Sequence, residues 1–354
     1  MQDFLRNFQN LIRNDNARTD NNVFQLYYKF SVIMFFVFSI LLSSKQYFGD
    51  PIHCDVESLK KEIVDVICWS SGTFTVQETL QDTYLSSQSL GGLGNEVGKT
   101  TYSLLYYQWI CLLFCIQALL FYVPRYLWKS WEGDRLGQIV KDLCGPLVSE
   151  KWTKSYKYKI RTYILSNENH NTFAYRFAFC ELLNFIILIF QFVLMNWYLN
   201  GNFSHYGYEV MIEPWPYTFN KVFPKKTKCT YSRFGPSGSV QTHDALCILP
   251  LNTLNEKFFL LIWFWMIFLF AVTICALLYR ITVLTSQQFR IFLLMAQARS
   301  LSRKKVKVVG KRVSHGQFFL LYNIGKMLNP IIYRELLMSI FEHLSDKDPN
   351  SLDF

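Results

Sequence analysis

The cysteines are the residues of this chain with the clearest capacity for chemistry. Nine occur among 354 residues, which is too few for a disulfide-rich scaffold. Four of them form two pairs that lie far apart in the sequence, Cys54 with Cys68 and Cys229 with Cys247. In an oxidising compartment these thiols are expected to form disulfides, and four cysteines allow three different pairings.

The histidines and acidic residues predict neither a catalytic site nor a metal site. No two of the six histidines stand three or four residues apart, so the sequence has no helical metal-binding pair. It also lacks a nucleophile elbow, a P-loop and a zincin motif. No charge lies in the core of a long apolar stretch, where an ion-coupled carrier would need one, and Glu181 stands only at the edge. We therefore expect no enzyme and no cofactor, and a channel, a scaffold or an adhesion protein remains.

The composition is that of a membrane protein. Hydrophobic residues make up 51% of the chain, charged residues only 18%, and the mean hydropathy is +0.12. A soluble protein of this size could not bury so much apolar surface. Four long uncharged stretches interrupt the sequence, at 30–44, 100–124, 182–208 and 258–279. Because a membrane helix needs roughly 17–25 residues, they predict four spans, at 24–47, 103–127, 181–201 and 257–280.

The distribution of basic residues predicts the orientation. The predicted cytoplasmic segments are the two termini (1–23 and 281–354) and the middle loop (128–180). Counted up to the apolar stretches, over residues 1–29, 125–181 and 280–354, they carry 26 of the 36 Lys and Arg. The other two loops are 48–102 and 202–256. Counted over residues 45–103 and 200–257, they carry 10 Lys and Arg. The positive-inside rule therefore places both termini and the middle loop in the cytoplasm. The first 22 residues are polar, without a cleavage site, so we expect the first span to act as the signal anchor.

This topology puts two cysteines in each extracellular loop. Cys54 and Cys68 belong to the first, and Cys229 and Cys247 to the second. The other five are scattered through the spans and the cytoplasmic loop. We therefore expect disulfide-bonded extracellular loops, with the pairing left open by the sequence itself. The predicted fold class is an all-α membrane protein with four transmembrane helices, cytoplasmic termini and a helical cytoplasmic domain.

The segment that opens the second span carries the most specific pattern. Tyr106, Tyr107, Gln108 and Trp109 precede Ile110, and alone they would fit an interfacial belt of aromatic residues. The pattern also resembles the YYQWV signature of the innexins, the invertebrate gap-junction proteins. Further similarity lies in DNNVF at 20–24, QYFGDPIHC at 46–54 and FYVPRYLWKSWEG at 121–133. The resemblance covers about residues 3–345, and two cysteines per extracellular loop fit innexins rather than connexins, which have three.

The resemblance implies a subunit of a large-pore channel in the plasma membrane, with a pannexin-like fold. It implies rings of eight subunits, of this chain alone or with other innexins. Two rings in apposed membranes dock into a gap junction and pass ions and small metabolites. It also implies nested disulfides, Cys54–Cys247 and Cys68–Cys229. The alternatives are an undocked hemichannel and an adhesion or scaffold protein without a pore.

Two segments of the cytoplasmic half could act in gating. The stripe of Phe4, Leu5, Phe8, Leu11 and Ile12 predicts an amphipathic helix within 1–23. The resemblance favours a helix folded into the pore mouth, formed by Met1, Gln2, Asp3, Phe4, Leu5, Phe8, Leu11 and Ile12; a helix lying on the inner leaflet is the alternative. Pro124, near the inner end of the second span, predicts either a hinge or a static bend.

Three surface features have simpler interpretations. Seven Lys and Arg within 299–312 are expected to meet anionic lipid headgroups, and no nucleic acid is expected as a partner. The first extracellular loop has a net charge of −4, which favours a weak cation preference in a ring. Asn202 begins a glycosylation sequon only about three residues beyond the third span, so we expect it to remain unmodified.

Overall fold

The computed structural model describes residues 20–56, 61–76, 101–133, 135–140, 143, 151–166, 170–212, 217–298 and 301–347. These residues divide into two compact units. Unit 1 contains residues 1–30, 121–186 and 271–354, and unit 2 contains residues 31–120 and 187–270.

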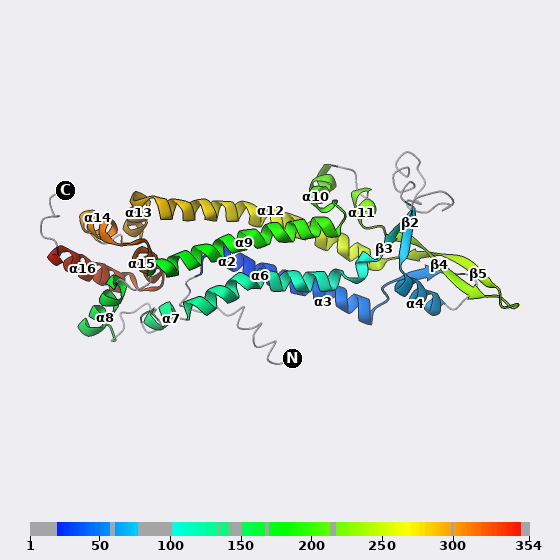
Figure 1. The fold of residues 1–354 in the computed structure, drawn as a ribbon, viewed down its shortest axis with the longest axis horizontal. Helices are drawn as coiled ribbons and strands as arrows, with labels where there is room; N and C mark the ends of the chain where they lie inside the picture. Colours follow the sequence, from blue (N-terminus) through cyan, green and yellow to red (C-terminus); the bar gives the residue numbers. More distant parts are fainter. Residues whose placement is uncertain are drawn as a thin grey trace. The chain divides into compact units, whose positions relative to one another are not determined.

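Four helices are long and apolar enough to cross a membrane, as the uncharged stretches predict. They cover Asn22–Phe48 (α2, the π-helical η1 and α3), Ile110–Glu132 (α6), His170–Tyr198 (α9) and Pro250–Thr285 (α12) (Figure 1). Within the first, α2 is Asn22–Gln25, η1 is Leu26–Ser31 and α3 is Val32–Phe48. Because α9 and α12 have 29 and 36 residues, both exceed what a bilayer core requires.

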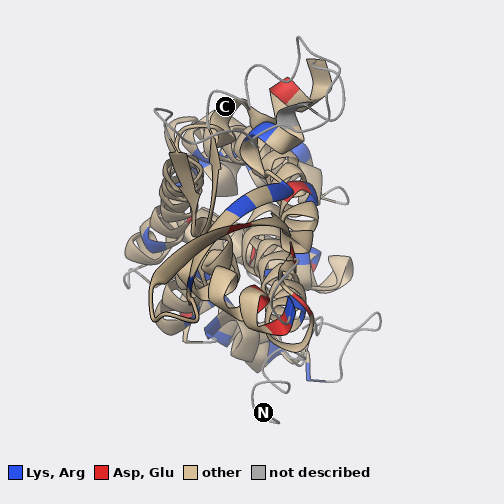
Figure 2. Ribbon diagram, turned by 90° about the vertical axis from the view of Figure 1, so that its right-hand side faces the viewer, with Lys and Arg blue, Asp and Glu red and all other residues tan. Residues whose placement is uncertain are grey.

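Unit 2 contains a five-stranded antiparallel sheet in the order β1-β5-β4-β2-β3. The strands are β1 His53–Asp55, β2 Thr73–Val76, β3 Thr101–Leu104, β4 Lys226–Phe234 and β5 Val240–Ile248. Helices α4 (Lys61–Ser71), α10 (Phe203–Ile212) and α11 (Tyr217–Val222) belong to the same unit, as does the 3-10 turn η2 (Tyr106–Gln108). In the view of Figure 2, Lys and Arg are blue and Asp and Glu are red, and both kinds occur among the described residues of this unit, as in the Lys228–Asp244 pair of β4 and β5.

The sheet was not anticipated from the sequence. The extracellular loops were expected to be held by disulfides, and the structure adds strands contributed by both loops. Strands β1, β2 and β3 come from the first loop, and the β4–β5 hairpin comes from the second. Backbone hydrogen bonds therefore join the two loops in addition to covalent bonds.

Unit 1 gathers the inner parts of the four long helices with six shorter ones. These are α7 (Arg135–Val140), α8 (Lys154–Leu165), α13 (Gln287–Gln297), α14 (Arg303–Arg312), α15 (His315–Met327) and α16 (Pro330–Lys347). Three begin at hydroxyl caps, because Thr153, Ser286 and Ser314 each accept a hydrogen bond from a backbone N–H in the first turn. Their apolar faces form one core with Trp128 and Phe177 of the long helices.

Candidate functional site

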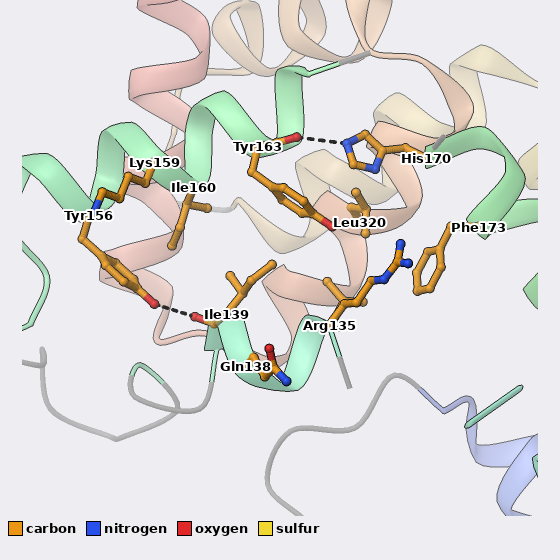
Figure 3. A pocket seen from close by; sticks show the side chains of 11 residues that line it. Arg135, Gln138, Ile139, Tyr156, Lys159, Ile160, Tyr163, His170, Phe173 and Leu320 are labelled. Carbon is orange, nitrogen blue, oxygen red and sulfur yellow. Dashed lines mark hydrogen bonds between the residues drawn. The ribbon is translucent and has the colours of Figure 1, made fainter. Parts of the chain in front are cut away.

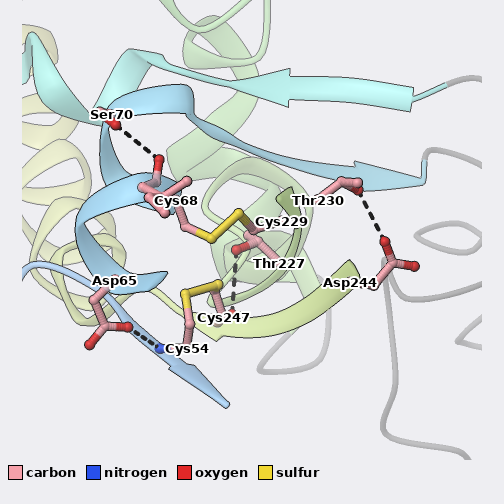
Figure 4. Close-up of a disulfide and its surroundings, with 10 residues drawn as sticks. Cys54, Asp65, Cys68, Ser70, Thr227, Cys229, Thr230, Asp244 and Cys247 are labelled. Carbon is pink, nitrogen blue, oxygen red and sulfur yellow. Dashed lines mark hydrogen bonds between the residues drawn. A yellow bond between two sulfur atoms is a disulfide. The ribbon is translucent and has the colours of Figure 1, made fainter. Parts of the chain in front are cut away.

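Two buried disulfides lie within the extracellular domain, one between strands β1 and β5 and one between α4 and β4 (Figure 4). Cys54 of β1 and Cys247 of β5 stand directly opposite each other in the strand register and are bonded. Cys68 of α4 is bonded to Cys229 of β4, with their Cα atoms 5.8 Å apart. This is the nested pairing that the resemblance implies. Each bond joins the first extracellular loop to the second.

The sulfur atoms of Cys54, Cys68 and Cys247 lie within 4.8 Å of one another, a spacing that could suggest a metal site. All three belong to the disulfides, however, and a disulfide lacks the thiolate that binds a metal. The cysteine cluster is therefore part of the buried interior of the extracellular domain. The Asp65 carboxylate supports it by accepting a hydrogen bond of 2.7 Å from the backbone N–H of Cys54.

In the part of the chain that the structure describes, the far part of the β4–β5 hairpin is exposed on both faces. Near the disulfides the strands alternate, with Thr227, Cys229 and Tyr231 buried and their neighbours more exposed. Toward the turn this alternation stops. Phe234 and Val240 face each other in register, yet their exposed fractions are 76% and 63%. Adjacent exposed apolar side chains of this kind are a feature of interaction surfaces.

The signature segment lies in and next to η2, where it connects four parts of unit 2. Tyr107 is 2% exposed, and its ring centroid lies 5.0 Å from that of Trp69 in α4. The Gln108 amide donates to the carbonyl of Trp69 at 2.5 Å, and the Gln108 carbonyl accepts from Gln46 of α3. The two central residues of the motif therefore fasten the outer end of the second span to α3 and α4.

Tyr106 makes the remaining two connections. Its hydroxyl donates to the carbonyl of Val222 at the end of α11, and its own carbonyl accepts from the Tyr198 hydroxyl of α9 at 2.6 Å. Only Trp109 is directed away from the protein, with an exposed fraction of 60%. The interpretation as an interfacial belt therefore fits Trp109, whereas the other three residues form an internal joint.

Two buried ion pairs hold the inner parts of the spans in unit 1. Arg280 of α12 donates two hydrogen bonds to Glu181 of α9, at 2.5 and 2.8 Å. Arg125 of α6 pairs with Asp20, which also accepts from the Tyr28 hydroxyl at 3.0 Å. Glu181 is thus paired in the protein interior, which the sequence interpretation of it as an interfacial residue missed. One feature of the sequence could have indicated this pair. Glu181 and Arg280 have opposite charges, and each is the first charged residue at the inner end of its span.

The remaining predicted sites are Pro124, the N-terminal residues 1–12 and the sequon at Asn202. Pro124 lies inside the continuous helix α6, so its role as a hinge stays a prediction. Residues 1–12, predicted to form the pore helix, lie outside the described residues. Asn202 lies in the turn before α10, and the Ser204 hydroxyl of its sequon donates to the carbonyl of Gly201.

Comparison with known proteins agrees with this architecture. The Innexin family model matches residues 20–344. The chain is 42% identical to "Innexin inx2" of Drosophila melanogaster, over 99% of both proteins. It is 39% identical to "Innexin inx2" of Schistocerca americana, over 98% of this chain and 99% of that protein. It is 35% identical to "Innexin shaking-B" of Drosophila melanogaster, over 97% and 95%.

A family match over nearly the whole chain accompanies four spans and paired extracellular cysteines. Such proteins lie in the plasma membrane at gap junctions, as multi-pass subunits of oligomeric channels. The chain belongs to the innexin family of gap-junction channel proteins.

Proposed function

We propose that this protein is a subunit of a large-pore channel that docks with a partner in the adjacent cell and passes ions and small metabolites. The observation that carries the docking step is the far part of the β4–β5 hairpin, where Phe234 and Val240 are exposed opposite each other. A surface of this kind is covered in an assembly. The disulfides at its base fix the hairpin before any contact is made, so docking costs little conformational entropy.

The proposed assembly is an octameric ring, of this chain alone or with other innexins. The long helices leave apolar side chains exposed on their outer faces, which suit lipid or a neighbouring subunit; among them are Leu112, Leu119, Ile186, Phe190, Val193, Leu261 and Phe268. Within such a ring the N-terminal residues 1–12 would line the pore mouth, and the acids of the first loop would favour cations. Asp65 has a separate role, since it binds the backbone of Cys54.

The test of docking is transfer of a small dye between paired cells that express only this protein. The double substitution Phe234→Ser with Val240→Ser should reduce transfer about tenfold while surface expression remains, because apolar anchors at interface centres dominate binding. Tyr208→Ser is the matched control, because Tyr208 is also an exposed aromatic side chain of unit 2 but lies on α10. Unchanged transfer in the double variant would remove the hairpin from the docking surface.

The undocked hemichannel is the second candidate. Conductance of single cells together with absent transfer between pairs would favour it, particularly if a glycosidase shifts the mobility of the surface protein through Asn202. Absent conductance in single cells and absent transfer between pairs would favour an adhesion or scaffold role.

A further inference from the structure

Unit 1 contains a cavity of about 900 Å³ that plays no part in the docking proposal (Figure 3). It opens between α7 and α8 of the cytoplasmic loop, the first turn of α9, and α15 of the C-terminal region. Among the residues that the structure describes, eleven line it: Arg135, Leu136, Gln138, Ile139, Tyr156, Lys159, Ile160, Tyr163, His170, Phe173 and Leu320. Its volume lies within the range of small-molecule binding sites.

The charge of this lining is positive. Arg135 of α7 and Lys159 of α8 contribute two cations, and none of the eleven lining residues is acidic. Among the residues that the structure describes, neither cation has an ion-pair or hydrogen-bond partner. Two cations whose described surroundings offer no carboxylate repel each other, and an anion bound between them would relieve that repulsion.

The first turn of α9 adds to the positive electrostatic potential of the cavity. This 29-residue helix begins at His170, so the positive end of its dipole lies beside the cavity. His170 itself is 8% exposed, and its Nε2 lies 2.9 Å from the carbonyl of Tyr163. This contact holds the end of α8 against the start of α9, so the polar wall is formed before any ligand binds.

The rest of the lining forms an apolar and aromatic wall. Figure 3 shows the rings of Tyr156, Tyr163 and Phe173 around the cavity, with Ile160 and Leu320 between them. The Tyr156 hydroxyl donates to the carbonyl of Ile139 at 3.1 Å, which fixes that ring and joins α8 to α7. An inorganic ion would leave these rings without contact, whereas an anion with an organic body would use both walls.

From these observations we propose that the cavity binds an organic phosphate from the cytoplasm, with the phosphate at Arg135, Lys159 and the start of α9 and the organic body against the aromatic wall. Two sources offer this chemistry, a nucleotide and the headgroup of an inositol phospholipid. Arginine suits phosphate because its planar fork donates two parallel hydrogen bonds. Since α7, α8 and α9 meet α15 here, the ligand would join the cytoplasmic loop to the C-terminal region.

The test uses the full chain in nanodiscs of neutral phosphatidylcholine, with binding measured by calorimetry. ATP probes the nucleotide, a short-chain phosphatidylinositol bisphosphate probes the lipid headgroup, and adenosine reports the organic body alone. The double variant Arg135→Gln with Lys159→Gln should weaken phosphate binding at least about tenfold, the loss expected for one charge-assisted contact. Both side chains are exposed, so the fold should persist, and thermal melting checks this.

Lys154→Gln is the matched control, since it removes one cation from the same helix without touching the cavity. We expect it to retain binding within about twofold, a difference well below 1 kcal/mol. Saturable binding of ATP, of the lipid probe or of both supports the proposal and identifies the source. Three results would overturn it: no saturable binding of either probe up to about 1 mM, equal loss in the control, or equal binding of adenosine and ATP. All are independent of docking and conductance.

Discussion

The carboxylate of Glu181 and the guanidinium of Arg280 form a two-pronged ion pair that joins the third and fourth spans. The guanidinium also lies over the rings of Phe177 and Phe319, with its central carbon 5.0 and 5.8 Å from their centroids. Both side chains are largely withdrawn from solvent, with exposed fractions of 9% and 14%. Each charge therefore depends on the other for its stability in the interior.

Replacing one partner of this pair should destabilise the protein strongly. For Glu181→Ala or Arg280→Ala we expect a loss of about 3–5 kcal/mol, because a buried charge is left uncompensated. Removing both together should cost less than the sum of the two single losses. Thermal melting of the four proteins in detergent measures this, with Lys304→Ala on the basic helix α14 as a surface control. Additive losses would show that the two groups act independently.

The disulfides should be essential for the extracellular domain. Cys68→Ser or Cys54→Ser should remove about 2–5 kcal/mol and leave the partner as a free thiol, so surface expression should fall. Cys111→Ser serves as the control, because Cys111 is not in a disulfide. Peptide mapping without reductant checks the pairing directly. A bond between Cys54 and Cys68 would contradict the nested arrangement.

Gly207 is required by the packing of α10 on the fourth span. A Cβ placed there would lie 2.1 Å from Cε3 of the Trp263 ring, and this ring is held by a hydrogen bond to the carbonyl of Ser204. Gly207→Ala should therefore destabilise by about 1–3 kcal/mol through overpacking. In a Trp263→Ala background the same change should cost much less. An equal cost in both backgrounds would assign the effect to the backbone instead.

His315 should make the cytoplasmic helices sensitive to acid. Burial, with a smaller contribution from the charge of Arg290, lowers the pKa of His315 below its ordinary value. As the pH falls through the ordinary value of about 6.5, the unfolded chain binds a proton that the native chain resists. Stability should therefore decrease below that pH and be fully present above it. Hydrogen exchange of α15 measures the change, which should shrink in His315→Gln but persist in His205→Gln.

Deleting residues 1–12 should leave assembly intact but alter conductance, because a segment in the pore mouth contributes little to the packing of the subunit. The measurement is surface labelling and particle imaging, paired with permeability to dyes of increasing size. Truncated rings at the surface with unchanged permeability to large dyes would assign the helix to the membrane surface.

Parts of the fold could be predicted from single stretches of sequence, and others could not. The four spans follow from uncharged length alone, since a bilayer excludes charge from its core. The inner extension of α9 was missed because Arg176 and Glu181 interrupt its apolar character, although both find partners in the folded unit. Strands β1, β2 and β3 were missed because they have only three or four residues each, too short for a periodic signal.

The candidate sites also differ in how far they could be predicted from the sequence. The signature residues could be recognised by their order, but their contacts with Trp69, Val222 and Tyr198 depend on tertiary packing. The cavity beside Arg135 and Lys159 could not be foreseen, because its walls come from segments that the sequence separates. Sequence spacing gives the faces of one element, whereas a cavity requires the relative placement of several.

The nested disulfides have a consequence for how the protein is made. Cys54 and its partner are 193 residues apart, so at roughly 5–20 residues per second synthesis separates them by about ten to forty seconds. During that interval Cys54 and Cys68 enter the secretory compartment together, and the nearest available partner of each is the wrong one. A bond formed between them in that interval must be broken by thiol exchange before the native bonds can form with the second loop. Delivery of finished subunits to the cell surface is thereby tied to the oxidising and isomerising capacity of the endoplasmic reticulum.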